Sequence, residues 1–394
     1  MTSCHPEAKP KDLLFSRRFL AWLGMTVLAV AFPVVAAESQ EQLPDSQATA
    51  PVRVPVRVCA GGDMTFGTNL DTAWAKLGER RLRSQFGILA HPDTLVSPLR
   101  ALFADADVLL LNVETAIGTG PAPRKCRPGS TSCYEFRGPP SVAPALRSLG
   151  DSNAVVVGNV ANNHARDAGP AGFLATARHL NDAGVLVTGM DTLATEVLLP
   201  DSTRMGILGF YTSTEVPDLR DLTAVRRHVE RAASRFDVVV VTAHMGAEGV
   251  AAQRTRDTTE LFLSTKINRG NPVAFARTAF EAGASLVVGH GPHVLRAAEW
   301  WDDRLALYSL GNLVTYGPFN NGEPINRGVV ACVDLDGRSV VGAQLRPTVQ
   351  VAPGIVRVDP TWRAMQLIDS LSALDFPATG VKVDGWGDLL RRAP

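Results

Sequence analysis

The sequence predicts an α/β fold in which buried strands alternate with helices. Short, almost purely apolar runs occupy 108–111, 154–158, 238–241 and 286–288, and such runs are typical of strands that are buried on both faces. Apolar residues at helical spacing precede each run, which is the order of elements in a parallel sheet. With 394 residues, of which 45% are hydrophobic and 20% are charged, the composition favours a single large globular domain.

The first 37 residues are predicted to be a signal peptide. Basic residues up to Arg18 precede the apolar stretch 19–35, and Ala36 and Ala37 follow it, so we expect cleavage after Ala37. The Arg17-Arg18 pair is similar to a twin-arginine export signal, although an ordinary secretory signal and an uncleaved membrane anchor are alternatives. We therefore expect an exported protein that is periplasmic or extracellular.

Three further segments follow the signal peptide. Residues 38–53 are rich in Gln, Ser, Ala and Pro without an apolar period, which predicts a disordered linker. The main domain is expected over 54–347. The tail, 348–394, is weakly patterned and receives no predicted function.

Polar side chains follow the first two buried strands. The strand at 56–60 runs into Gly-Gly and then Asp63, so Asp63 lies at its carboxyl end. The strand at 108–111 ends in Asn112 and, two residues later, Glu114. Residues two apart in a strand share a face, so we expect Asn112 and Glu114 to project together.

Each of the other three buried strands runs into a histidine-containing segment. These segments contain Asn163 and His164 after the third strand, His244 and Glu248 after the fourth, and His290 and His293 after the fifth. The carboxyl ends of parallel strands border one crevice, so we expect all these side chains to converge. Imidazole, carboxylate and amide ligands without thiolates suit Mn, Fe, Zn or Co, and the set therefore predicts a metal site.

The remaining pattern supplies the other elements. The apolar pattern at 328–335 and 340–346, with Asp336-Gly337 between them, predicts two strands that form a hairpin. Residues 250–271 form an insertion of mixed polarity. Further strands are expected at 185–188 and 205–210, and helices at 93–104, 142–149, 173–180, 221–234 and 272–282.

Four cysteines remain after the signal peptide. Cys126 and Cys133 flank a short loop-like stretch, so we predict a disulfide between them in an oxidising compartment. Cys59 and Cys332 lie in strand-like runs, and we expect both to be buried free thiols.

The charge pattern gives no reason to expect nucleic acid as a partner, because the formal net charge is zero and basic runs with interleaved aromatics are absent. A Gly/Pro-rich loop at 118–140 carries Arg124, Lys125, Arg127 and Arg137. This loop could bind an anionic substrate, and a solvated basic loop is the alternative.

The order of several short motifs resembles one bacterial family. The motifs are GGD, NVET, ANNHARDAG, HMGAE, GHGPH and YSLGN, and they span about 56–345. In this order they are similar to the capsule-synthesis CapA family, also called the poly-gamma-glutamate synthesis family, a branch of the calcineurin-like metallophosphoesterases.

The resemblance implies a four-layer α-β-β-α sandwich with two divalent metal ions at the strand ends. It implies that His164 is a proton donor, held by a hydrogen bond that its ring donates to Asp167. Residues expected beside the ligands or the substrate are Asn112, Glu248, Tyr308 and Asn312. The metal ligands that it implies are Asp63, Glu114, Asn163, His244, His290 and His293.

The sequence departs from the wider superfamily at three ligand positions. Thr65 stands where a histidine usually follows Asp63 by two residues, Glu114 replaces the more common aspartate, and the last two histidines are spaced His-x-x-His. Met245 also replaces the tryptophan that is more usual in this branch.

The function that the resemblance implies is an exported metal-dependent hydrolase acting on a phosphoester or on an anionic cell-envelope polymer. The alternative is an accessory protein of poly-gamma-glutamate or capsule synthesis and export, which grips polymer carboxylates without turnover. The expected partners are such a substrate and the capsule or poly-gamma-glutamate synthesis machinery, with membrane contact only through an uncleaved signal.

Overall fold

The computed structural model describes the folded part of the chain. The predicted signal peptide, the whole predicted linker, Cys133, Arg124, Lys125 and Arg127 lie outside the described residues and stay predictions. The structure describes residues 54–392 except 68–79, 81–82, 85–90, 120–125, 127–133, 263–265, 316–321 and 352–353.

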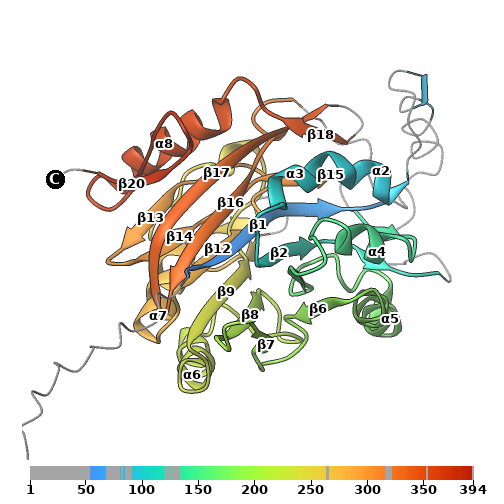
Figure 1. Cartoon of the computed structure of the whole chain (residues 1–394), viewed down its shortest axis with the longest axis horizontal. Coiled ribbons are helices and arrows are strands. Elements are labelled where there is room, and N and C mark those ends of the chain that lie inside the picture. Colours follow the sequence, from blue (N-terminus) through green and yellow to red (C-terminus); the bar gives the residue numbers. More distant parts are fainter. Residues whose placement is uncertain are drawn as a thin grey trace, which may run out of the picture. The chain divides into compact units, whose positions relative to one another are not determined.

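Two sheets form the centre of the fold (Figure 1). The larger sheet has the order β18 (Ile355–Val358), β17 (Ser339–Val351), β16 (Arg327–Asp336), β1 (Val56–Thr65), β2 (Val108–Val113), β5 (Val155–Asn159) and β6 (Val185–Thr188), with β15 (Asn312–Thr315) also paired to β1. The smaller sheet has the order β13 (Ala298–Trp301), β14 (Arg304–Leu307), β12 (Leu286–His290), β9 (Val238–His244), β8 (Arg204–Tyr211) and β7 (Thr195–Leu198).

Helices cover the outer face of each sheet, and this confirms the four-layer α-β-β-α sandwich. One apolar cluster joins the two sheets, for example through Val58 and Val240. A second packs the larger sheet against helices, and a third does the same for the smaller sheet. The helices are α2 (Pro92–Val96), α3 (Arg100–Phe103), α4 (Val142–Arg147) and α5 (Gly169–Asp182) on the larger sheet, and α6 (Leu222–Ala233) and α7 (Pro272–Glu281) on the smaller one.

Local sequence explains where these helices begin. The Asn271 side chain accepts hydrogen bonds from the amides of Val273 and Ala274, and Pro272 follows it in the first turn of α7. Asp221 caps α6 in the same way by accepting from the Ala224 amide. The predicted 93–104 helix is instead divided into α2, a 3-10 turn and α3, because Pro98 interrupts the hydrogen-bond pattern.

Parallel pairing brings the strand ends together. In the larger sheet Asp63 pairs in register with Asn112, which in turn pairs with Asn159. In the smaller sheet His244 lies between Tyr211 and His290. The residues after each strand therefore meet along one edge of the sandwich, where open α/β sheets bind ligands.

The C-terminal residues are part of the sandwich. The predicted domain boundary at 347 falls within β17, and β18 extends the larger sheet by one strand. Met365 and Ile368 of α8 (Arg363–Asp375) are buried in the cluster between the sheets. The last elements are the paired strands β19 (Val381–Val383) and β20 (Leu389–Arg391), beside two other small pairs, β3 (Ala116–Ile117) with β4 (Arg137–Gly138) and β10 (Leu261–Phe262) with β11 (Ile267–Asn268).

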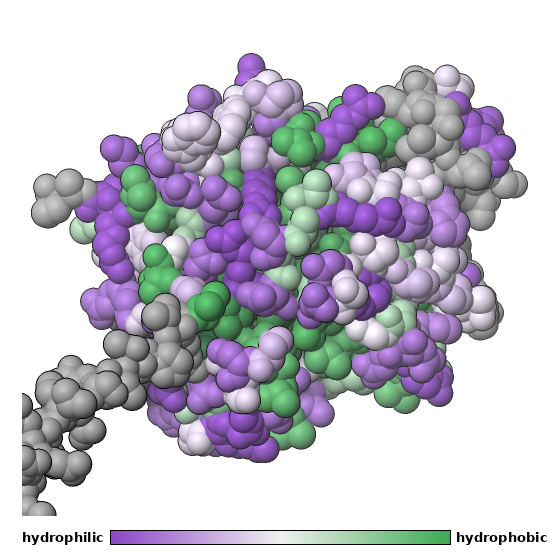
Figure 2. All heavy atoms as spheres, in the orientation of Figure 1, coloured by the Kyte–Doolittle hydropathy of each residue, from purple (hydrophilic) through white to green (hydrophobic). Residues whose placement is uncertain are grey.

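The surface shows no broad apolar face in the view of Figure 2, where hydrophobic residues are interspersed with hydrophilic ones. Within the described ranges, no helix combines the length and the hydropathy needed to cross a bilayer.

The cysteine prediction is wrong for Cys59 and Cys332. The two residues face each other across β1 and β16 and form a disulfide, with a Cα–Cα distance of 4.0 Å. Pairing between strands 273 residues apart in sequence determines this bridge, and the local apolar pattern carries no signal of it. Cys126 is also disulfide-bonded. Its predicted bond to Cys133 involves a residue outside the described ranges, so that pairing stays a prediction.

Candidate metal centre

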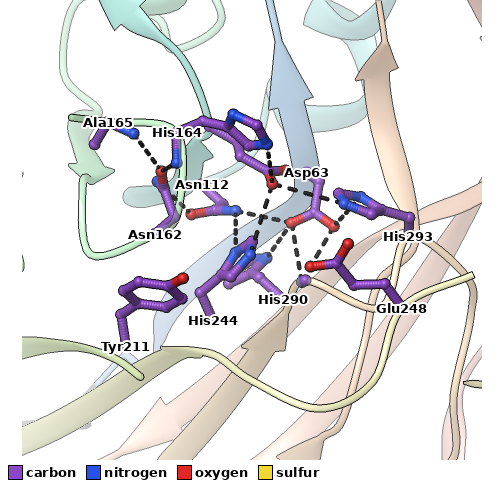
Figure 3. Close-up of polar contacts among 12 residues, drawn as sticks. Asp63, Asn112, Asn162, His164, Ala165, Tyr211, His244, Glu248, His290 and His293 are labelled. Carbon is purple, nitrogen blue, oxygen red and sulfur yellow. Dashed lines mark hydrogen bonds and ion pairs between the residues drawn. The ribbon is translucent and has the colours of Figure 1, made fainter. Parts of the chain in front are cut away.

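The site lies where the carboxyl ends of both sheets meet. Figure 3 shows side chains from β1, β2, β9 and β12 and from the following loops converging on one point. Asp63, Asn112, Glu114 and His244 are fully buried, and His290 is nearly so. The predicted convergence of these strand ends is present in the structure.

Asp63 is held rigidly at the end of β1. Its backbone amide donates to Gly311 O at 2.9 Å, and the backbone amide of Gly291 donates to its carboxylate at 3.2 and 3.3 Å. Asn112 Nδ2 donates to Asp63 Oδ1 at 2.8 Å. Burial raises the pKa of Asp63, but the hydrogen bond from His293 and the nearby imidazoles lower it more, so the carboxyl stays ionised.

Glu114 lies among imidazoles without a hydrogen-bond partner for its carboxylate. Its Oε1 lies 3.6 Å from His244 Nε2, 3.6 Å from His293 Nε2 and 4.0 Å from His164 Nε2. These separations are too long for hydrogen bonds, and both carboxylate oxygens are buried without one. Burial is the main reason that the pKa of Glu114 is raised well above its usual range.

Two buried histidines hold their rings toward the same point. His244 Nε2 and both ring nitrogens of His290 are buried without a hydrogen-bond partner. Burial lowers the pKa of His244 well below its usual value, with the Arg269 guanidinium adding to the effect. Burial also lowers the pKa of His290 to about 4. Both rings are therefore neutral near pH 7, as a metal ligand must be.

His293 connects the two carboxylates. Its Nδ1 lies 3.1 Å from Asp63 Oδ2, and its backbone has a positive φ of 58°, an uncommon conformation that follows Gly291 and Pro292. Burial lowers the pKa of His293, but the charge of Glu114 and the hydrogen bond with Asp63 raise it to about 10. The proton on this ring supplies positive charge that a divalent cation can supply instead.

The donor set fits a divalent cation. Ligand atoms of Asp63, Glu114 and His293 all lie within 4.8 Å of one another. A buried carboxylate without a hydrogen bond costs several kcal/mol, and about this much is recovered when a cation is bound beside it. The oxygens of Glu114 and the nitrogens of His244 and His290 are buried without a hydrogen-bond partner and are the N/O donor types that a divalent cation accepts, and their role as ligands stays a prediction.

His164 and Asp167 form a hydrogen-bonded pair at the edge of this cluster. His164 Nδ1 lies 2.6 Å from Asp167 Oδ2, as the resemblance implied. Asp167 also accepts the backbone amide of Phe136 at 2.7 Å, and the Phe136 ring centroid lies 4.2 Å from that of His164. The carboxylate and the ring together fix the imidazole with Nε2 directed toward Glu114.

The loop that carries His164 is organised by Asn162 rather than by its neighbour Asn163. Asn162 Oδ1 accepts the backbone amides of His164 and Ala165, and its Nδ2 donates to Val113 O at 2.9 Å. The side-chain oxygen of Asn163 is buried. The role of Asn163 as a metal ligand stays a prediction.

Three of the four residues predicted beside the ligands are present there. Asn112 contacts Asp63 and lies 3.3 Å from His244 Nδ1, and Asn312 Oδ1 lies 3.0 Å from His293 Nδ1. Glu248 is on the wall of the cleft described below.

Tyr308 is the exception, and its predicted place beside the site is wrong. Its hydroxyl donates to Glu299 Oε2 at 2.7 Å, and its ring stacks on Phe376 in the helix-covered core of the smaller sheet. The orientation of Tyr308 at the end of β14 directs the side chain to that face, and the sequence motif alone does not specify it.

Two residues of the site lack any signal in the sequence. Arg269 is buried, and its guanidinium lies 3.0 Å from Glu248 Oε1, with Nε donating to Gly246 O at 3.0 Å. Tyr211, at the end of β8, places its ring centroid 5.6 Å from that of His244. Arg269 belongs to the 250–271 insertion, where an isolated basic residue has no distinguishing pattern.

A cleft of about 360 Å³ opens above the cluster. His164, His293 and Glu248 form part of its wall. The rest is mostly apolar, and its aromatic residues are Tyr134, Phe136 and Phe262.

Comparison with known proteins gives one family and several partial relatives. The model of the family described as bacterial capsule synthesis protein PGA_cap matches residues 57–316. The PGA biosynthesis protein CapA of Bacillus subtilis is 27% identical over 186 residues, which cover 43% of this chain and 45% of that protein. The uncharacterized protein y4sH of Sinorhizobium fredii is 33% identical over 99 residues, 25% of this chain and 19% of that protein.

The matched segment spans less than half the length of the CapA protein and about a fifth of the length of y4sH. Among solved structures, a Staphylococcus aureus protein described as a candidate 5′-nucleotidase in complex with alpha-ketoglutarate has a TM-score of 0.43 and 13% identity, covering 80% of this chain and 58% of its own.

Proposed function

Because the chain belongs to the bacterial capsule synthesis PGA_cap family, we propose that it is an exported, metal-dependent hydrolase with phosphoesterase-like chemistry that acts in capsule or poly-γ-glutamate metabolism. One observation carries the hydrolase proposal. The buried Glu114 carboxylate lies among three imidazoles without a hydrogen bond, and one of these imidazoles belongs to the His164–Asp167 pair.

The proposed ligands come from both sheets. They are Asp63, Glu114, Asn163, His244, His290 and His293, with Mn, Fe, Zn or Co as the metals that suit such donors. When bound, divalent cations supply Lewis acidity and activate a water molecule near neutral pH.

His164 is the proposed proton donor to the leaving group. Its Nδ1 proton is held by Asp167 Oδ2 at 2.6 Å, so the carboxylate stabilises the imidazolium form. In that form Nε2, which faces the cluster and the cleft, carries the proton that can be transferred. A site that only grips polymer has no need of such an oriented acid.

Metal content and turnover test these roles separately. We expect the purified mature protein to contain divalent metal and to hydrolyse bis-p-nitrophenyl phosphate or p-nitrophenyl phosphate. His293→Ala should lower bound metal, while His164→Ala should retain it and lose turnover about 100-fold or more. His228→Ala, on α6 and away from the site, is the matched control and should change neither. Equal metal loss in the His164 and His293 variants would overturn the assignment of His164 as an acid.

A second candidate function follows from the relative described as a PGA biosynthesis protein. Here the protein is a non-catalytic accessory of polymer synthesis or export, and its crevice holds polymer carboxylates. Tight binding of poly-γ-glutamate by metal-loaded protein, without turnover of either phosphoester with any of the four metals, would favour this function over hydrolysis.

The Cys59–Cys332 disulfide supports the proposed export. Stable structural disulfides form in oxidising compartments such as the periplasm and are rare in the cytosol. Fractionation of cells that produce the full-length tagged protein should place it in the periplasm or the medium, and recovery only in the cytosol would contradict export.

A further inference from the structure

The cleft beside the cluster has an apolar wall. Tyr134 and Phe136 come from the segment before β4, Phe262 comes from β10, and Ile325 precedes β16, so three separate segments contribute. Tyr134 and Phe136 stack with ring centroids 6.4 Å apart. Aromatic side chains from separate segments form a surface that favours flat, apolar groups.

In the described part of its lining, the cleft offers a polyanion no side-chain cation other than the imidazoles of His164 and His293. Among the described residues that line it, none is Lys or Arg, and Glu248 adds a carboxylate. Arg269 lies nearby, but it is only 3% exposed and is engaged by Glu248, Gly246 O and the Tyr211 hydroxyl. Away from these two imidazoles, a second anionic group would therefore meet the Glu248 carboxylate and aromatic rings among the described residues of the lining.

From this lining, and resting on the proposed function, we propose that the site selects a phosphoester with one anionic group at the cluster and an aromatic group in the cleft. A polyanionic chain is disfavoured. In this arrangement the phosphoryl group lies at the end of the cleft that His164 and His293 form, and the planar group packs against Phe262 and Ile325.

Binding of two phosphonates tests this proposal without requiring turnover. Benzylphosphonate and methylphosphonate carry the same anionic group, have uncleaved C–P bonds and differ in the aromatic ring. Calorimetry on metal-loaded protein should show benzylphosphonate binding about 10-fold more tightly than methylphosphonate, because aromatic packing contributes on this scale. Pentaglutamate should bind more weakly than benzylphosphonate.

Substitutions in the cleft should remove this preference selectively. Phe262→Ala should reduce the 10-fold preference to about 2-fold and leave the methylphosphonate Kd unchanged. Leu261→Ala is the matched control, since adjacent strand residues face opposite ways and Leu261 is 40% exposed outside the cleft. Ile325→Ala is a second cleft variant if Phe262→Ala fails to fold.

The outcomes distinguish the inference about the aromatic group from the hydrolase proposal. Equal binding of the two phosphonates, equal weakening of both in Phe262→Ala, or pentaglutamate binding as tight as benzylphosphonate would overturn the inference alone. A 10-fold preference without phosphoester turnover would support the inference and overturn the hydrolase proposal. Failure of both phosphonates to bind would overturn the inference, and phosphoester turnover in the same preparation would leave the hydrolase proposal standing.

Discussion

Reduction of the Cys59–Cys332 disulfide should destabilise the protein strongly. The bridge joins β1 to β16 and closes a loop with a sequence separation of 273 residues. The chain-entropy relation for a loop of this length predicts a loss of about 5–6 kcal/mol, and measured losses for native disulfides are typically about 2–5 kcal/mol. Both cysteines are almost fully buried, so on reduction the two sulfurs must also move apart within a packed interior.

Urea unfolding of the mature, metal-loaded protein measures this loss. Oxidised and reduced wild-type protein isolate the effect of the cross-link, and the Cys59→Ala/Cys332→Ala double variant adds the loss of buried sulfur. We expect the free energy of unfolding to fall by at least about 2 kcal/mol on reduction, and further in the double variant. Equal urea midpoints for oxidised and fully reduced protein would refute the reasoning.

Three other changes test the site and its support. Asp167→Asn should retain bound metal but lower turnover about 100-fold, because the imidazolium of His164 loses its carboxylate; unchanged turnover would argue against the pair. Gly62→Ala should destabilise the protein and reduce its metal content, because an added Cβ would lie 2.2 Å from Gly311 O beside Asp63, whereas Gly385→Ala has open space and should be neutral in thermal unfolding. In metal-free protein, the pKa of His290 is lowered from 6.5 to about 4, so the folded state favours the neutral ring. This preference contributes about 3 kcal/mol to the free energy of unfolding above pH 6.5, and the contribution is lost as the pH falls toward 4. The pH dependence of unfolding of metal-free His290→Gln should lack this loss.

Local pattern was sufficient for the main strands and for placing several candidate site residues at their carboxyl ends. Apolar runs mark β2, β5, β9 and β12, and the polar residues after them lie at the carboxyl ends, where parallel strands meet. The convergence of Asp63 and His293, 230 positions apart, followed from this rule and from the resemblance to one family. The hairpin of β16 and β17 was predicted from its Asp336-Gly337 turn.

Other features depend on which strands pair and on how their side chains are oriented. Cys59 meets Cys332 only because β16 pairs antiparallel with β1 in that register. Arg269 reaches Glu248 because the 250–271 segment folds back on the site. The tail contributes β18 and α8 to the sandwich although its sequence has no strong period.

The sequence by itself determined most elements, the edge at which the main strands end and the chemical type of the side chains gathered there, because periodicity and residue type act over neighbouring positions. The tertiary structure alone decided the disulfide, the direction of Tyr308 away from the site and the aromatic wall of the cleft. These features arise from contacts between segments far apart in the chain, and strand register and the course of the loops set those contacts.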